Sequence, residues 1–214
     1  MSVHLKAALI VAALAAPFAL TASADAGDSV LGQVDQTFDL SQIPSGTYET
    51  EKNHSALFFE ISHFGLSAYI GSFNTLDAKL TFDNADPTLS TVEATIDPAS
   101  VDTRVTKLNE HLKDADFFDV VNFPQATFKS TKVEKTGDAT GKITGDLTLH
   151  GVTKPVVLDV TFNGGAPNPF SKQFTLGFSG RTVIKRSDFG ISAFLPKIGD
   201  TVALRIEAEF AKVP

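Results

Sequence analysis

The chain has 214 residues, no Cys, no Trp and a formal net charge of −7. The absence of Cys excludes disulfide scaffolds, thiolate metal sites and Cys nucleophiles. The acidic balance argues against a general nucleic-acid-binding protein. Hydrophobic residues make up 43% of the chain, and Phe accounts for 18 of the aromatic residues against 2 Tyr. Because Phe carries no hydrogen-bonding group, this composition predicts a folded protein with a large apolar interior.

Residues 1–24 have the pattern of a secretory signal peptide. Lys6 precedes an apolar run of about 14 residues that ends in the small residues Ala22-Ser23-Ala24. This run is shorter than the ~20 residues that a membrane-spanning helix needs. We therefore expect cleavage before Asp25, a periplasmic or secreted protein, and no stable membrane insertion after cleavage. Residues 25–44 are a polar lead-in segment, interpreted as a linker or as a segment strapped onto the domain of residues 45–214.

From Tyr48 onward, apolar and polar residues alternate with a period of two. In the first long run, Leu57, Phe59 and Ile61 alternate with polar or outward-facing residues. The pattern recurs near residues 76–82, 92–97, 126–129, 143–150, 156–162, 175–179 and 202–210. Such alternation is typical of antiparallel strands with one buried face. Because closure leaves no exposed sheet edges, we predict a mainly β fold, an extended antiparallel β-barrel of about eight strands.

One segment breaks this period. Within residues 103–113, Val105, Leu108 and Leu112 follow helical spacing. Asp102 precedes them and is a suitable N-cap residue. The sequence therefore predicts one helix inserted in the barrel, followed by Phe117 and Phe118 in a loop where two aromatic rings need cover.

Sequence motifs for chemistry are missing. The chain has no nucleophile elbow, P-loop or dinucleotide-binding motif, and its His residues show no metal-ligand spacing. We therefore predict neither an enzyme nor a metal or cofactor site. His63 is notable because it continues the apolar face of the first long strand, where it could contact the polar end of a ligand.

A short internal similarity relates two segments. Residues 64–69 read FGLSAY and residues 189–194 read FGISAF. A Gly after an aromatic residue allows a strand to bend or bulge. We predict that both segments lie at bends of the sheet near one opening.

Several motifs, in order along residues 48–210, resemble those of the YceI-like family of exported polyisoprenoid-binding proteins. The most specific is the run GDLTLHGVTK at residues 145–154. The others are Asn53-His54-Ser55, His63-Phe64-Gly65, Gly71-Ser72-Phe73, Ser100-Val101-Asp102-Thr103, Asp116-Phe117-Phe118-Asp119, Arg186-Ser187-Asp188-Phe189-Gly190 and Gly199-Asp200. The resemblance implies a lipocalin-like barrel with an apolar pore, often in a homodimer. It also implies a long amphiphilic lipid as partner: an isoprenoid quinone, a polyprenyl chain or a fatty-acid-like lipid.

The expected lining of this pore combines the inward strand positions with the loop after the helix. It comprises Phe59, Ile61, His63, Leu80, Phe82, Phe117, Phe118, Phe128, Leu147, Leu149, Leu158, Phe178, Leu204 and Ile206, with Phe117 and Phe118 as a lid. Arg104, Lys154 and Arg186 are candidates for a charged head group. For Arg186 a structural pairing with Asp188 or with a neighbouring loop is favoured.

Two alternatives to a lipid carrier remain at the level of sequence. One is a stress or interaction protein with a solid core and no ligand. The other, ranked lower, is a lipid-modifying enzyme that uses His63 as an acid or base.

Overall fold

The computed structural model describes residues 37–214. The predicted signal peptide and residues 25–36 of the lead-in segment lie outside the described residues. One α-helix, α1, covers Thr106–Lys113. The strands are β1 (Gly46–Thr50), β2 (Ala56–His63), β3 (Ser67–Phe73), β4 (Leu76–Phe82), β5 (Thr91–Ile96), β6 (Val101–Asp102), β7 (Ala126–Lys135), β8 (Thr140–Leu149), β9 (Val152–Pro167), β10 (Phe174–Lys185) and β11 (Ile198–Lys212). Short 3-10 turns are η1 (Leu40–Gln42), η2 (Lys52–His54), η3 (Pro87–Leu89), η4 (Pro98–Ser100) and η5 (Arg186–Phe189).

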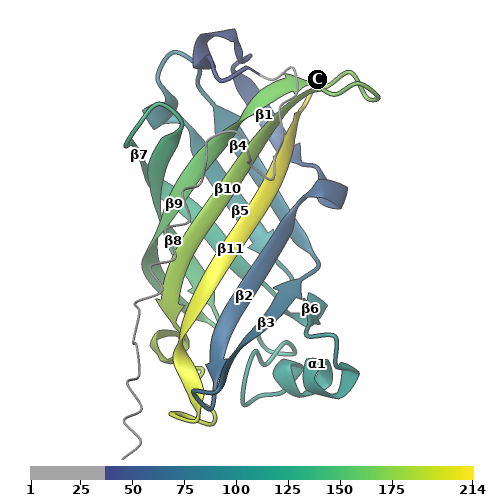
Figure 1. Ribbon diagram of the computed structural model, residues 1–214, viewed down its shortest axis with the longest axis vertical. Helices are drawn as coiled ribbons and strands as arrows, with labels where there is room; N and C mark the ends of the chain where they lie inside the picture. The colour runs from purple at the N-terminus through teal and green to yellow at the C-terminus, as the bar shows by residue number, and fades with distance from the viewer. Residues whose placement is uncertain (1–36) are drawn as a thin grey trace, which may run out of the picture. The chain divides into compact units, whose positions relative to one another are not determined.

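The strands close into an antiparallel barrel (Figure 1). The order β1-β4-β5-β7-β8-β9-β10-β11 returns to β1, so the closed ring has eight strands and the predicted fold is confirmed. β11 is long enough to pair with β10 along its length, with β1 near its end and with β2 nearer its start. The turn η2 separates β1 from β2, which are successive pieces of the same side of the barrel.

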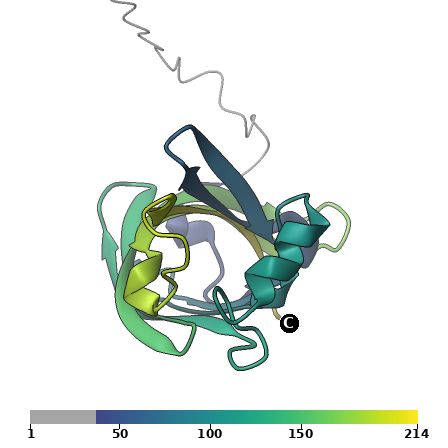
Figure 2. The same ribbon diagram turned by 90° about the horizontal axis from the view of Figure 1, so that it is seen from below.

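The two ends of the barrel differ in how the wall is built. The pairing between β5 and β7 ends at Ile96 opposite Ala126. Beyond that level, β3 pairs with β2 and with the two-residue β6, and α1 with the following loop occupies the space toward β7 (Figure 2). This half, called the α1 end below, also carries the β2–β3 turn and the segment 186–197. Its wall is therefore made partly of helix and loops.

The helix begins later than predicted. α1 starts at Thr106 with Val105 at its N-cap, and no side chain caps it. The expectation that Asp102 caps the helix is wrong, because Asp102 lies in β6 and its carboxylate accepts from the backbone N–H of Arg104. A buried Thr103, whose hydroxyl hydrogen-bonds to Asn109, anchors the start of the helix instead.

At the end opposite α1, most of the interior is packed, beside a smaller cavity of about 120 Å³. Ile43, at 0% exposure, and the lead-in residue Leu40 join this cluster, and Phe38 contacts Phe162 with ring centroids 6.5 Å apart. The buried residues of the cluster are Ile43, Tyr48, Leu80, Phe82, Phe162, Leu176, Ala208 and Phe210. The described part of the lead-in segment thus packs into the barrel and closes this end.

Tyr48 provides a test of this packed end. Its side chain is fully buried, its hydroxyl donates to the carbonyl of Pro44, and burial raises the pKa of Tyr48 to about 12. Because the pKa is higher in the folded state, this contribution to stability is complete below about pH 10 and is lost as pH rises through about 12. Tyr48→Phe leaves the Pro44 carbonyl without its donor, and we expect a loss of about 1–3 kcal/mol at pH 8.

Urea unfolding of both proteins between pH 8 and pH 12 checks the Tyr48 prediction. The stability difference should narrow above pH 10, because only the wild type loses this contribution there. A difference that stays constant across this range would show that Tyr48 does not carry the alkaline dependence.

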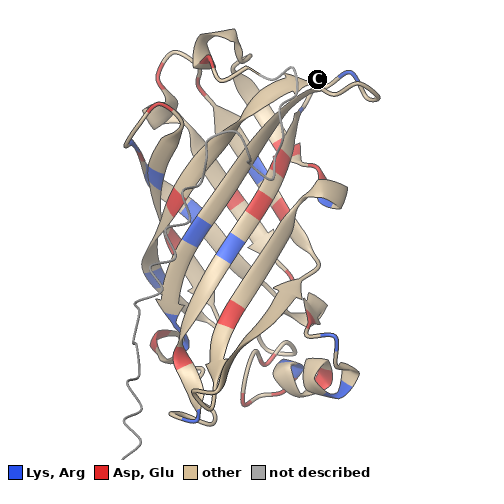
Figure 3. Ribbon diagram, in the orientation of Figure 1, with Lys and Arg blue, Asp and Glu red and all other residues tan. Residues whose placement is uncertain are grey.

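The outer face of the barrel is charged and solvated (Figure 3). Charged side chains of both signs alternate with the inward residues and pair across neighbouring strands, as in Lys129–Glu93 at 2.8 Å between β7 and β5. Because both partners are solvated and screened by salt, such exposed pairs contribute little to stability. The alternation thus determines which face of each strand is exposed to solvent, while burial of the apolar face provides most of the stability.

Candidate functional site

A cavity of about 390 Å³ occupies the α1 half of the barrel. This volume is within the range of about 300–1,000 Å³ that is usual for ligand pockets. Its wall is formed by β2, β3, β5, β7, β8, β10 and β11, by α1 and the loop after it, and by the segment 186–198. The strand residues that line it include Leu57, Phe59, Ile61, Phe73, Leu147, Leu149, Ile184, Val202 and Leu204.

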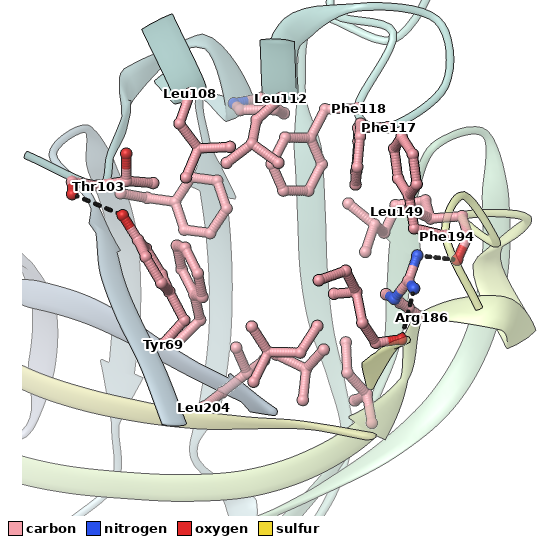
Figure 4. A pocket seen from close by; sticks show the side chains of 18 of the residues that line it. Tyr69, Thr103, Leu108, Leu112, Phe117, Phe118, Leu149, Arg186, Phe194 and Leu204 are labelled. Carbon is pink, nitrogen blue, oxygen red and sulfur yellow. Dashed lines mark hydrogen bonds between the residues drawn. The ribbon is translucent and has the colours of Figure 1, made fainter. Parts of the chain in front are cut away.

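The inward alternation of the strands supplies most of this apolar wall. Phe59 and Leu204 are opposite each other in the register of β2 and β11, so both rows face the same interior. α1 completes the wall with Leu108 and Leu112, which point into the cavity (Figure 4). These residues are four apart and share one face of the helix.

Two polar residues in the wall use their polar groups on the protein itself. The Tyr69 hydroxyl donates to the Thr103 carbonyl at 3.2 Å (Figure 4). The Thr103 hydroxyl and backbone N–H both bond to the side-chain oxygen of Asn109. The surface that these residues present to the cavity is therefore apolar, although the residues themselves are polar.

Arg186 lines the cavity and is almost completely buried, at 5% exposure. Its guanidinium donates to four backbone carbonyls, those of Ile191, Ala193, Ile198 and Gly199. Burial lowers the pKa of Arg186, and the nearby carboxylate of Asp200 partly opposes this shift. The expected partnership with a neighbouring loop is confirmed, whereas a pairing with Asp188 is wrong. Arg186 holds the segment that closes one side of the cavity.

Aromatic side chains and His gather at the mouth of the cavity. Phe194 lies against Phe117 with ring centroids 6.0 Å apart, and His111 lies 5.1 Å from the Phe117 ring. His63 also lines the cavity and is exposed, and its ring centroid lies 4.5 Å from that of Phe64. Phe117 and Phe194 thus join the loop after α1 to the segment 190–197.

The two similar segments, 64–69 and 189–194, lie near one opening, as predicted. Residues 64–66 form the β2–β3 turn, and residues 189–194 leave η5 in a loop. Phe64, Tyr69, Ile191 and Phe194 all line the cavity. The prediction that both segments lie near one opening is confirmed, but they are connections between strands and not bends within the sheet.

The expected lining residues divide into three groups. Eight lie on the large cavity, namely Phe59, Ile61, His63, Phe117, Phe118, Leu147, Leu149 and Leu204. Three line a second cavity of about 120 Å³ toward the other end, namely Leu80, Phe82 and Phe178. Phe128, Leu158 and Ile206 line neither cavity. Whether any of them contacts a ligand stays a prediction.

The three residues outside both cavities are taken up by packing. The Phe128 ring lies directly over Gly145, so closely that a Cβ there would collide with it. Leu158 packs on the cluster of Val156, Ile184 and Phe189. Ile206 packs on both the cluster of the closed end and that around Leu57, so it lies at the boundary between the packed and the hollow half.

Among the candidates for a charged head group, only Arg186 lines the large cavity. Arg104 and Lys154 are exposed on the surface. For His63, no carboxylate among residues 37–214 lies within ion-pair distance, so an acid–base pair of side chains is not assembled there.

Within the same residues, no group of three His, Asp or Glu side chains is arranged to hold a metal ion. None of the described helices is long and apolar enough to cross a membrane.

Sequence reasoning missed several cavity residues. Leu108 and Leu112 show helical spacing, which predicts the helix but not that this face of it lines the cavity. Tyr69 and Phe73 belong to β3, whose sequence SAYIGSF alternates too weakly to stand out. For Phe194, the similarity of segments 64–69 and 189–194 placed its loop near an opening but did not assign its ring to the cavity wall.

Comparisons with known proteins agree with this architecture. A family model described as a YceI-like domain matches residues 48–210. The UPF0312 protein of Ectopseudomonas mendocina (strain ymp) is 41% identical over 170 residues, which cover 78% of this chain and 88% of the relative.

Two solved structures are also similar. Burkholderia cenocepacia BcnA has a TM-score of 0.68 and 26% identity, covering 75% of this chain and 98% of BcnA. A polyisoprenoid binding domain from Saccharophagus degradans, implicated in plant cell wall breakdown, shares the fold with a TM-score of 0.60 and 16% identity, covering 79% of this chain and all of that domain (100%). With its eight-stranded barrel and its match over residues 48–210, the chain belongs to the YceI-like family.

Proposed function

We propose that this protein binds and carries a long amphiphilic lipid, with the tail in the large cavity and the polar end at the mouth. The observation that carries the proposal is the distribution of polarity along the cavity. Its deep wall is apolar, while His63, His111 and Lys197 lie around the mouth. The similarity to a polyisoprenoid binding domain supports a lipid of the isoprenoid or acyl class.

The dimensions of the hollow half favour a tail about as long as one membrane leaflet. Along β2, the cavity runs from His63 to Leu57. This is about 20 Å of strand, or about 15 Å along the barrel axis for a tilt of ~40°. One leaflet is about half of the ~30 Å hydrocarbon core of a bilayer. Each methylene of the tail that is buried contributes roughly 0.8 kcal/mol to the free energy of binding, before the cost of ordering the tail is subtracted.

Native mass spectrometry of protein purified without detergent from its own host tests this proposal. We expect one lipid of defined mass per barrel, released on denaturation and identified by analysis of the extract. The delipidated protein should also bind the fluorescent fatty acid cis-parinaric acid. Repeated recovery without any lipid, together with no binding of that probe, would contradict the proposal and favour a barrel without a ligand.

We further propose that the carrier works outside the cytoplasm. This rests on the signal-peptide pattern of residues 1–24, since an exported carrier would move a water-insoluble lipid through an aqueous compartment. Mass spectrometry of the N-terminal peptide from fractionated cells tests the idea. A chain that starts at Asp25 in the periplasmic or secreted fraction is expected, and a chain that keeps Met1 in the cytoplasm would contradict it.

A further inference from the structure

The loops around the cavity mouth expose apolar side chains to solvent. Leu66 in the β2–β3 turn is 87% exposed, and Val121 in the loop after α1 is 88% exposed. Phe64 and Phe194 are 54% and 56% exposed. The four residues come from three separate loops that meet at the α1 end (Figures 1 and 2). We call Phe64, Leu66, Val121 and Phe194 the apolar rim.

The backbone holds two of these side chains in an unusual conformation. Phe64 and Phe194 have φ values of +54° and +61°, in the left-handed region that bulky residues rarely adopt. The backbone N–H of Phe64 also donates to the carbonyl of Lys197 at 2.8 Å, which joins the β2–β3 turn to the segment 190–197. Such strain persists where the surroundings enforce it, and it is concentrated at functional sites. The rim is thus a constrained feature of the fold.

The charges around the rim are mixed in sign. Lys107 lies on α1, Arg104 just before it, Asp114 and Asp116 in the loop after it, and Lys197 in the segment before β11. Among the described residues, neither Lys107 nor Lys197 forms an ion pair. Apolar tips next to basic and acidic side chains fit a surface with both phosphate and ammonium groups, as zwitterionic phospholipids present.

We propose that the apolar rim docks on a zwitterionic phospholipid bilayer, so that a lipid passes between membrane and cavity without crossing water. This inference rests on the proposed function, because the rim surrounds the mouth through which a tail would enter. Partial insertion of a few exposed apolar residues gives reversible binding, in contrast to a spanning helix. The docking itself requires no bound ligand.

The absence of Cys from the sequence permits a site-specific test on the full chain as its host produces it. Leu66→Cys places an environment-sensitive nitrobenzoxadiazole dye on the rim. Phe170→Cys places the same dye on the opposite end, at a residue that is 93% exposed. With phosphatidylcholine vesicles, we expect a blue shift and a severalfold gain in emission at position 66 and no change at position 170. No change at position 66, or equal changes at both positions, would overturn the docking proposal.

A second experiment measures transfer. Leu66 and Val121 do not line the cavity, so Leu66→Ser/Val121→Ser should keep the affinity for cis-parinaric acid. We expect about tenfold slower transfer of this probe to phosphatidylcholine vesicles, because each substitution removes inserted apolar surface. The control Leu89→Ser/Phe170→Ser, at the other end, should transfer as the wild type does. Equal transfer rates in both variants would contradict docking.

The two proposals fail in different ways. If the wild type binds no cis-parinaric acid but the labelled Leu66→Cys variant still gives the blue shift, the carrier is contradicted and the docking surface stays in place. If the wild type binds cis-parinaric acid and the labelled Leu66→Cys variant gives no shift, only the docking surface is contradicted. If phosphatidylglycerol vesicles alone produce the shift, the surface recognises anionic lipid and the assignment to zwitterionic bilayers is wrong.

Discussion

Replacing Arg186 with Met is expected to lower the free energy of unfolding by about 3–4 kcal/mol, the largest loss we expect from one substitution. The guanidinium donates to four carbonyls between Ile191 and Gly199, and its side chain is almost completely buried. Met has a similar length but no donor, so these carbonyls lose charge-assisted hydrogen bonds at once. Because the same segment forms one side of the cavity, we also expect binding of cis-parinaric acid to fall by about tenfold or more.

Urea unfolding and probe titration check the Arg186 prediction, with Arg181→Met as the matched control. Arg181 lies on β10, the strand that leads into η5 and Arg186, and its side chain is exposed. Its replacement should change stability by no more than about 0.5 kcal/mol. Arg186→Lys keeps the charge but offers at most three donors without the planar fork, so it should recover only part of the loss. Equal stabilities of the two Met variants would show that the carbonyl contacts are not what holds this segment.

The same substitution should have opposite consequences in the two halves of the barrel. Ala126 lines the large cavity, whereas Ala208 belongs to the packed cluster of the closed end. In delipidated protein, Ala208→Phe should cost about 3 kcal/mol, because a filled core has no room for a ring. Ala126→Phe should cost less than about 1 kcal/mol, because its ring enters space that is already empty.

Ligand binding provides the second readout of this pair. A ring at position 126 takes the place of the tail, so we expect the affinity for cis-parinaric acid to fall by at least about tenfold. In the wild type, a bound ligand raises the unfolding temperature, and in Ala126→Phe this rise should disappear. The Ala208→Phe protein should keep both the affinity for cis-parinaric acid and the rise in unfolding temperature. The amount of bound probe should fall only in proportion to the fraction of folded protein. A large loss of stability from Ala126→Phe, with binding unchanged, would show that the tail lies elsewhere.

The fold was largely predictable because one physical rule governs most of the chain. Alternation along residues 57–61 or 202–206 predicts which side chains face inward, and closure of the sheet follows from burying that face. The candidate site was predictable only in part. Alternation predicts that Phe59, Leu204, Phe128 and Ile206 all face inward and line the pore. Only Phe59 and Leu204 lie on the large cavity.

The sequence by itself determined the barrel, its inward residues, the inserted helix and, through its motifs, the family. Tertiary structure alone decided where along the axis the interior is hollow. That depends on how rings such as Phe128 fold over Gly145 and on how Ile43 and Tyr48 close the far end. It also decided that Arg186 holds a loop and that Leu108 and Leu112 of α1 face the cavity. The reason is that an alternation with a period of two shows only which face of its strand a residue is on. Whether the interior is hollow or packed at that residue depends on contacts between segments far apart in the chain.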